Sequence, residues 1–268
     1  MKLGFIGAGN MAGAIIKGFI NKNCVNSSDI YFIRQNKEKQ AQQAKELGIN
    51  GCDDYDGLIE NSDILFLGVK PVVFPTLLPQ ISKSVKKKNP LVVSMAAGLT
   101  TDIIREMLGY DAKIIRIMPN VNAAIAMSTT AVCKNEFASD EDLATIKNLF
   151  STIGLTTEVP ENQFAIFTAI AGCSPAYVYM FIDGLARGAQ KMGMNKQKAL
   201  EIAASAVIGS ASMYAQSNEH PQELVDKVCS PGGTTIEGVT TLEEYKFTAG
   251  VVKAVENSIL KDRELSKK

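Results

Sequence analysis

The sequence predicts an α/β domain built on a parallel sheet, followed by an all-α domain. Two observations support this fold class. Up to about residue 160, short apolar runs alternate with helix-like segments. After Pro160 no persuasive strand appears, and long stretches rich in Ala, Met and Gly follow. We therefore expect residues 1–160 to form one domain and residues 161–268 a second, a division that suits a chain of 268 residues.

The elements of both domains follow from their apolar patterns. Near-continuous apolar runs separated by amphipathic segments, such as Met11–Ile20 and Lys37–Leu47, are typical of a parallel sheet covered on both faces. The predicted strands are Leu3–Ile6, Ile30–Ile33, Ile64–Val69, Leu91–Ser94, Ile114–Met118, Thr130–Cys133 and Thr156–Val159. The predicted helical stretches of the second domain are Gln163–Met192, Lys196–Ser217, Gln222–Val228 and Thr248–Glu264.

Composition and charge exclude several classes of function. The 28 basic and 28 acidic residues cancel, so no net basic field favours nucleic acid as a partner. The five cysteines form no CxxC pair, and His220, the single histidine, precedes Pro221 in a polar turn. We therefore expect no disulfide framework, no metal site and no histidine-based hydrolase. Reduced thiols and the lack of a visible signal peptide predict a cytoplasmic protein.

One stretch has nearly the length of a membrane-spanning helix. Phe164–Ile182 carries no charge over 19 residues. Its centre is interrupted at Gly172–Pro175, and acidic residues flank it without a basic bias on either side. We interpret it as a helix buried in protein and expect no membrane contact. A helix that is apolar on all sides needs cover, which a subunit interface would supply.

A glycine-rich turn follows the first predicted strand and opens a helix. Its sequence, Gly7-Ala8-Gly9-Asn10-Met11-Ala12, is a GxGxxA form of the Rossmann dinucleotide-binding fingerprint. Gly7 permits a tight turn, Gly9 lets the backbone approach a pyrophosphate, and Ala12 allows the helix to pack closely on the strand. The helix N-terminus then offers free amides to the phosphates. Residues 7–11 are therefore candidate cofactor-binding residues.

The end of the second predicted strand indicates which dinucleotide binds. An NAD site usually has an acid there, but Arg34 follows Ile30–Ile33, and Asp29 lies at the wrong end of the strand. A guanidinium matches a phosphate in geometry and charge. We therefore expect NADPH, with NADH as the alternative.

Other segments follow the carboxyl ends of strands, where open α/β sheets bind ligands. They are Val69-Lys70-Pro71, Ala96-Ala97-Gly98 and Pro119-Asn120. We include them, apart from Pro119, among the candidate cofactor-binding residues. Local pattern leaves two interpretations of Lys70 open, a charge near the cofactor or a strand-end lysine facing solvent.

A second glycine-rich segment lies late in the helical half, at Ser230–Gly238. Pro231-Gly232-Gly233 predicts a turn with exposed amides. Thr234 and Glu237 have the spacing of a capping box, which would leave the hydroxyl of Thr235 free. Such a turn before a helix suits an anion such as a carboxylate, and a plain capping turn is the alternative.

Together these motifs resemble the Δ1-pyrroline-5-carboxylate reductase family. The similarity runs in order along nearly the whole chain through FIGAGNMA, FLGVKP, SMAAG, RIMPN, GCSPAY and SPGGTTIEGVTTLE, the last being the most specific. The resemblance implies NAD(P)H-dependent reduction of the C=N bond of pyrroline-5-carboxylate to L-proline, the last step of proline biosynthesis. It implies that the helical domain interlocks with a second subunit, and that such dimers often assemble into a decamer.

The resemblance also implies residue roles. Gly232, Gly233 and Thr234 would hold the substrate carboxylate, and Thr235 would bond the imine nitrogen as the catalytic residue. The chain departs from the family at Cys173 and Ser174, where a serine and a glycine are common, and after Asn120. Two alternatives are a 3-hydroxyacid dehydrogenase, for which Lys191 is the nearest catalytic lysine, and a nucleotide-binding protein without catalytic activity.

Overall fold

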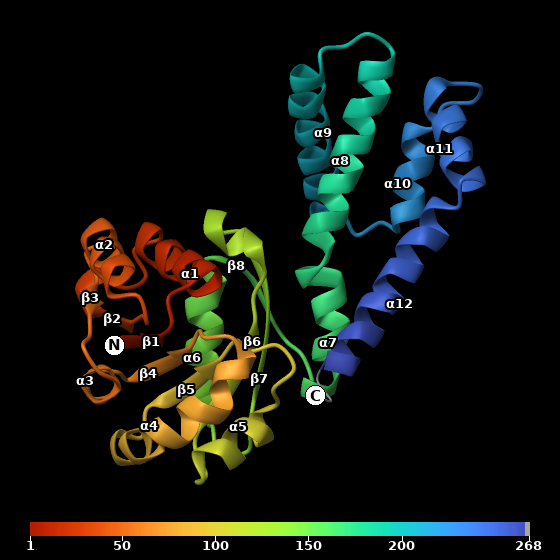
Figure 1. The fold of residues 1–268 in the computed structure, drawn as a ribbon. Helices are drawn as coiled ribbons and strands as arrows, with labels where there is room; N and C mark the ends of the chain where they lie inside the picture. Colours follow the sequence, from red (N-terminus) through yellow and green to blue (C-terminus); the bar gives the residue numbers. More distant parts are fainter. Residues whose placement is uncertain (266–268) are drawn as a thin grey trace. The chain divides into compact units, whose positions relative to one another are not determined.

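The computed structural model describes residues 1–265, which form two compact units (Figure 1). Residues 1–172 and the end of the last helix, from Ile259, make up the first unit, and Cys173–Ser258 make up the second. The predicted Rossmann-type domain and the helical region after it are both confirmed. The division falls later than Pro160, where the sequence pattern changes, because Phe164, Phe167 and Ala171 still pack with side chains of the sheet unit.

The first unit is built on an eight-stranded sheet with the order β3-β2-β1-β4-β5-β6-β7-β8. The order reverses at β1, so β2 and β4 flank it on opposite sides. All neighbouring strands are parallel except β6 and β7. The strands are β1 (Leu3–Ile6), β2 (Ile30–Ile33), β3 (Asn50–Gly51), β4 (Ile64–Leu67), β5 (Leu91–Ser94), β6 (Ile114–Met118), β7 (Ser128–Lys134) and β8 (Gly154–Glu158).

Two features of the sheet differ from the sequence prediction. Strand β7 is longer than Thr130–Cys133 and runs antiparallel to β6, because the short connection over residues 119–127 cannot carry the chain back to the start of a parallel strand. Strand β3 was not predicted. It has only two residues, Asn50 and Gly51, neither of which belongs to an apolar run.

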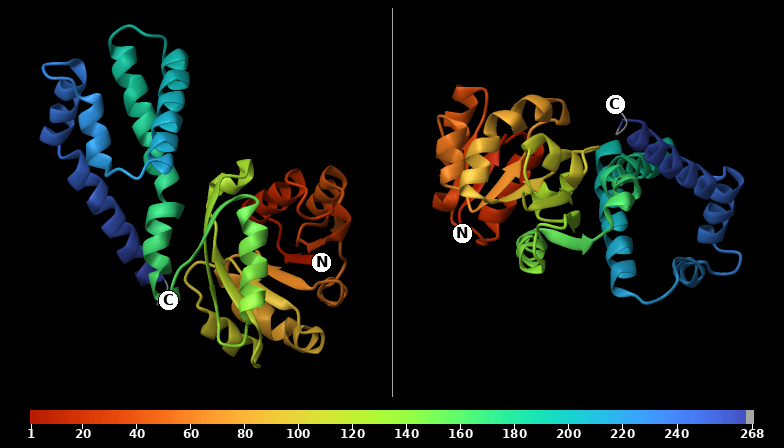
Figure 2. Two further views of the ribbon diagram at one scale, coloured as in Figure 1. Left: turned by 180° about the vertical axis from the view of Figure 1, so that it is seen from behind. Right: turned by 90° about the horizontal axis from the view of Figure 1, so that it is seen from below.

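Helices cover both faces of the sheet, as Figure 2 shows from two further directions. Apolar side chains of α1 and α6 form one core with the sheet, and those of α3, α4 and α5 form another. The first core contains the stacked rings of Phe5 and Phe66, whose centroids lie 4.5 Å apart. The helices are α1 (Asn10–Asn21), α2 (Lys37–Leu47), α3 (Tyr55–Glu60), α4 (Phe74–Lys88), α5 (Thr101–Leu108), α6 (Asp140–Ser151) and α7 (Phe164–Phe167).

The second unit consists of helices. Within it, α8 and α9 pack along each other, and the hydroxyls of Tyr177 in α8 and Ser258 in α12 lie 2.7 Å apart. The helices that form or enter this unit are α8 (Ser174–Lys191), α9 (Lys196–Gln216), α10 (Pro221–Val228), α11 (Thr234–Glu244) and α12 (Phe247–Leu265).

The second unit does not bury its large apolar side chains within one chain. The buried side chains that the structure describes on α8 to α12 are one proline and three alanines: Pro175, Ala186, Ala199 and Ala203. Large apolar side chains are exposed instead, among them Val178, Tyr179, Met180, Leu185, Ile202, Ile208, Met213, Tyr214, Leu242, Tyr245, Val251 and Val252. The unit therefore has apolar faces that need cover from outside the chain.

The predicted apolar helix around Gly172 consists of α7, a π-helical turn and α8. The helical run Glu161–Lys191 has the length and composition that a membrane span needs, and only 17% of its most apolar window is buried in the single chain. It passes through a π-helical turn at Thr168–Gly172 before α8 begins at Ser174, with Pro175 in the first turn. The buried Asn120 side chain donates to the carbonyl of Ala171 at 3.0 Å and so holds this turn against the sheet unit.

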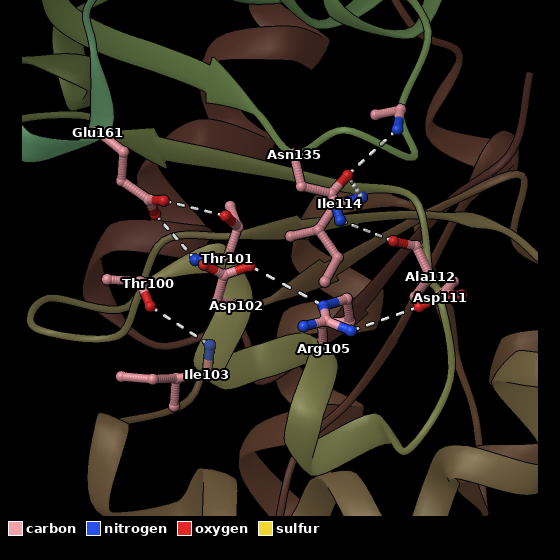
Figure 3. Close-up of polar contacts among 11 residues, drawn as sticks. Thr100, Thr101, Asp102, Ile103, Arg105, Asp111, Ala112, Ile114, Asn135 and Glu161 are labelled. Atoms are coloured by element: carbon pink, nitrogen blue, oxygen red, sulfur yellow. Dashed lines mark hydrogen bonds and ion pairs between the residues drawn. The ribbon is translucent and has the colours of Figure 1, made fainter.

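Glu161 anchors the start of this helical run to the sheet unit. Its carboxylate accepts hydrogen bonds from the backbone amide and the hydroxyl of Thr101, at 2.8 and 2.9 Å (Figure 3). Thr101 is the first residue of α5, so Glu161 satisfies a helix-end amide that has no partner inside the helix. The same carboxylate lies 3.2 Å from the guanidinium of Arg116, which is only 5% exposed.

We predict that Glu161→Ala destabilises the protein. The substitution leaves the buried Arg116 charge and the first amide of α5 without their partner, which should lower the free energy of unfolding by about 2–3 kcal/mol. Urea unfolding at fixed protein concentration measures this change. Glu60→Ala, at an exposed site at the end of α3, is the control and should stay within about 0.5 kcal/mol. Equal stabilities of the two variants would contradict the anchoring role.

Candidate functional site

The turn between β1 and α1 owes its shape to close packing of small residues. Gly7 has φ +87°, and a Cβ there would lie 2.8 Å from Val69 Cγ1 and 2.9 Å from the carbonyl oxygen of Gly68. A Cβ on Gly68 would lie 2.5 Å from the Gly7 carbonyl and 3.0 Å from the Cβ of Ala12. The glycine at residue 7 is therefore required by the packing of the turn itself.

Gly9 has a different reason to lack a side chain. It is the N-cap residue of α1, with φ −72°, and a Cβ there would meet nothing within 4 Å. The protein's own packing thus does not require glycine here, whereas a ligand approaching the backbone would. No side chain caps the first turn of α1, so its amides are available to an anion. The turn therefore has the free amides and open backbone that the predicted pyrophosphate site requires.

The turn opens into a groove of about 480 Å³ within the sheet unit. Of the predicted cofactor-binding residues, Ala8, Gly9, Asn10 and Arg34 line it. Sequence reasoning missed several further lining residues on α1 and α2, which are Gly13, Ala14, Lys17, Lys39, Gln42, Gln43 and Glu46. A signal for two of them was present, because Lys39 and Gln43 are four residues apart on the helix that follows Arg34 and so share one of its faces.

Arg34 is a half-buried residue just after β2 and lies at the edge of this groove. Its Nη1 donates to the side-chain oxygen of Gln43 at 2.8 Å. Four charged residues line the groove, and two of them, Lys17 and Glu46, pair with each other at 2.9 Å. The other two, Arg34 and Lys39, are cations, and their charges would attract an anion bound in the groove.

The remaining predicted cofactor-binding residues lie at the carboxyl ends of neighbouring strands. Val69, Lys70 and Pro71 follow β4, and Lys70 is exposed, which fits the interpretation of a solvent-facing strand-end lysine. Ala96, Ala97 and Gly98 follow β5, where Ala96 is buried and Gly98 adopts φ +78°. Met11 packs beside the core under α1. Because β1, β4 and β5 are adjacent and parallel, all these segments share one edge of the sheet with the glycine turn.

Asn120, which follows β6, is only 4% exposed and is engaged in shaping its own loop. Its side-chain oxygen accepts from the amides of Asn122 and Thr129, both at 3.3 Å, while its Nδ2 donates to Ala171. These bonds hold the connection between β6 and β7. The structure thus supports a positioning role for the Asn120 side chain at this edge.

The second glycine-rich segment forms a tight turn before α11. The amide of Gly233 donates to the carbonyl of Ser230 at 3.0 Å, which closes a four-residue turn with Pro231 and Gly232 at its centre. Gly232 has φ +67°, as the third residue of a type II turn requires. A Cβ on Gly233 would lie 2.2 Å from the Ser230 hydroxyl oxygen and 3.1 Å from its carbonyl oxygen, so a side chain there would require the Ser230 side chain to move.

The capping box predicted at Thr234 is wrong. Gly233 is the N-cap residue of α11, Thr234 is the first helical residue, and no side chain caps the helix. The turn already positions Gly233 to begin the helix, so a threonine cap is unnecessary. The consequence is an uncapped N-terminus with Thr234 exposed and Thr235 half-buried in its first turn. This segment lies in the second unit.

Other candidate residues have structural roles. His220 caps α10, where its Nδ1 accepts from the amide of Gln222 at 3.2 Å. Lys191 is an exposed residue at the end of α8. Burial raises the pKa of the Cys133 thiol to about 12, which keeps it protonated and chemically inert at neutral pH. Among residues 1–265, no group of three or more His, Cys, Asp or Glu side chains is placed to hold a metal ion.

Comparisons with known proteins show which family this chain is similar to. Residues 161–265 match the family model for pyrroline-5-carboxylate reductase dimerisation, and residues 2–98 match that for NADP oxidoreductase, coenzyme F420-dependent. The pyrroline-5-carboxylate reductase of Escherichia coli is 41% identical and the alignment covers 99% of this chain and 98% of that protein. The reductase of Methanosarcina acetivorans is 35% identical, covering 100% of this chain and 98% of that one.

Solved structures extend the likeness to three dimensions. A pyrroline carboxylate reductase from Plasmodium falciparum, solved with NADP bound, superposes with a TM-score of 0.89 at 29% identity, covering 99% of this chain and 98% of that one. The 1-pyrroline-5-carboxylate reductase of Streptococcus pyogenes gives a TM-score of 0.88 at 38% identity, covering 98% of both chains.

We predict opposite consequences for alanine at the two glycines of the turn. Gly9→Ala should leave the thermal unfolding temperature unchanged, because its Cβ enters open space, yet should weaken dinucleotide binding roughly 10-fold or more, because that space is where a pyrophosphate approaches. Gly7→Ala should instead lower the unfolding temperature, since it combines a positive φ with contacts below 3 Å. Differential scanning fluorimetry and a binding titration measure both effects. Unchanged binding in Gly9→Ala would refute the assignment of the pyrophosphate site.

Proposed function

The chain belongs to the pyrroline-5-carboxylate reductase family, and we propose that residues 7–11 with Arg34 form its cofactor site and Gly232–Thr235 its substrate site. The enzyme reduces the C=N bond of 1-pyrroline-5-carboxylate to give L-proline, the last step of proline biosynthesis. The observation that carries the assignment is the pair of uncapped helix N-termini, each preceded by a glycine turn, one in each unit. A 3-hydroxyacid dehydrogenase would leave the second of these turns without a role.

We propose that different residues of the cofactor site bind different parts of the dinucleotide. The cofactor is NADPH, which supplies the hydride. The amides at the start of α1 hold the pyrophosphate, with Gly9 giving the backbone access. Arg34 selects the 2′-phosphate, and the strand-end segments Val69–Pro71 and Ala96–Gly98, with the loop that Asn120 holds, complete the site along the same sheet edge.

At the substrate site the chain orients the substrate and delivers one proton. The free amides at the start of α11, after Gly232 and Gly233, hold the substrate carboxylate, and the helix dipole adds to the attraction. The hydroxyl of Thr235 donates a hydrogen bond to the unprotonated ring nitrogen and relays a proton from water to it before hydride arrives. A protonated imine is already an electrophile, so no acyl intermediate is needed, and correct orientation supplies much of the rate.

We propose that a second copy of the chain covers the exposed apolar faces of α8 to α12. The match of residues 161–265 to a dimerisation region supports a dimer of this enzyme, which explains how an apolar helix with so little burial in one chain is covered. Beyond the dimer, we propose a decamer of five dimers.

We also propose that the enzyme acts in the cytoplasm on its small-molecule substrate, without membrane or nucleic-acid partners. Its five free thiols and balanced charge support this proposal.

We predict that Thr235→Ala lowers kcat/KM for pyrroline-5-carboxylate roughly 10- to 100-fold, the effect of losing one hydrogen bond to the reacting nitrogen. Steady-state oxidation of NADPH at 340 nm measures it. Thr240→Ala, at an exposed site in the middle of the same helix, is the control and should keep the wild-type value within about twofold. Wild-type kcat/KM in Thr235→Ala would eliminate its catalytic role.

We predict that Arg34→Ala raises KM for NADPH roughly 10- to 100-fold, because a charged hydrogen bond to the 2′-phosphate is lost. KM for NADH should remain near the wild-type value, since NADH lacks that phosphate. The control is Lys45→Ala, at an exposed site on α2 outside the groove, which should change neither constant. A parallel rise in both KM values for Arg34→Ala would show that Arg34 does not select the phosphate.

A further inference from the structure

Two glutamines of α2 bind Arg34, one at its backbone amide and the other at its guanidinium. Gln40, only 6% exposed, accepts the Arg34 backbone amide on its side-chain oxygen at 2.8 Å, and its Nε2 donates to the carbonyl of Cys52 at 2.8 Å. Gln43 takes the other end, where Nη1 of the Arg34 guanidinium donates to its Oε1 at 2.8 Å. A free arginine side chain has many rotamers, and the bond to Gln43 reduces their number before any ligand arrives.

The position of Gln43 allows it to orient the Arg34 guanidinium towards the groove. Its carboxamide reaches from α2 towards α1, where a Cβ built on Gly13 would lie 3.4 Å from Gln43 Nε2. Gly13, Gln43 and Arg34 all line the same groove as Gly9 and Asn10. The guanidinium is therefore held at the wall of the space that the cofactor occupies.

The chemistry of the carboxamide matters as much as its position. A neutral acceptor orients the guanidinium and leaves its full charge to act on a phosphate, whereas a carboxylate at the same position would pair with that charge. The acid that does line the groove, Glu46, is already paired with Lys17. Arg34 and Lys39 thus face the ligand without a competing anion in the lining.

We infer that Gln43 is a positioning residue for cofactor selection, which acts through Arg34 by holding its guanidinium ready for the 2′-phosphate. This inference rests on the proposed role of Arg34. It assigns to this glutamine a share of the preference for NADPH over NADH, without direct contact with the cofactor.

The test uses calorimetric binding of 2′,5′-ADP and 5′-AMP, which differ only in the 2′-phosphate, to the intact enzyme, so it does not depend on turnover. Gln43→Met keeps the length and helix propensity of the side chain but removes the acceptor. We expect it to weaken 2′,5′-ADP binding roughly 3- to 10-fold and to leave 5′-AMP binding unchanged. Gln43→Glu should weaken 2′,5′-ADP binding further, because it adds a charge that pairs with Arg34. Gln80→Ala, at an exposed helical site on α4, is the control for both ligands.

A double-mutant cycle separates positioning from direct contact. If Gln43 acts through Arg34, Gln43→Met should have no further effect on 2′,5′-ADP binding in an Arg34→Ala background. Additive losses would overturn the inference, as would wild-type discrimination in Gln43→Met. A wild-type enzyme that binds the two nucleotides equally would instead refute the role of Arg34 itself. Retained 5′-AMP binding by Gln43→Met shows that the variant has folded.

Discussion

The second unit lacks a core of its own, and this constraint governs much of the molecule. The side chains that its helices bury are alanines and a proline, while many of its tyrosines, methionines and branched aliphatic side chains are exposed. Small residues permit close helix contacts but bury little apolar area, so they contribute little hydrophobic stabilisation. The helices must therefore gain most of their burial from a second copy. Folding of this half and formation of the dimer are then one process, and stability depends on protein concentration.

The sheet unit shows which elements can be predicted from sequence patterns alone. Buried parallel strands need apolar side chains on both faces, and this need leaves runs such as Ile64–Leu67 that are easily recognised. The two-residue edge strand β3 does not need apolar side chains, because it is held by backbone hydrogen bonds to β2. It therefore leaves no apolar run in the sequence. The direction of β7 depends on the length of the connection before it and on tertiary packing, and composition alone does not reveal either.

The candidate site was predictable where backbone geometry dictates the residue type. Gly7 and Gly232 adopt positive φ values, and their neighbours in sequence make the turns recognisable. The contacts of Asn120 and Gln43 were not predictable, because they join segments far apart in the chain or reach across from one helix to another element. The threonine cap failed for a related reason, since the spacing of Thr234 and Glu237 carries no information about the turn that already begins the helix at Gly233.

The π-helical turn at Thr168–Gly172 also has a consequence for how this family can vary in length. Such a turn accommodates one residue more than the α-helical path between the same ends. Removing one residue here would therefore restore regular winding and leave the later positions of α8 close to where they are. Each residue advances a regular α-helix by about 100°, so removing a residue within α8 itself would rotate every later position by that angle. The residue count can thus change by one at this turn without altering the face that α8 presents to other helices, whereas a change of one residue inside α8 turns that face away.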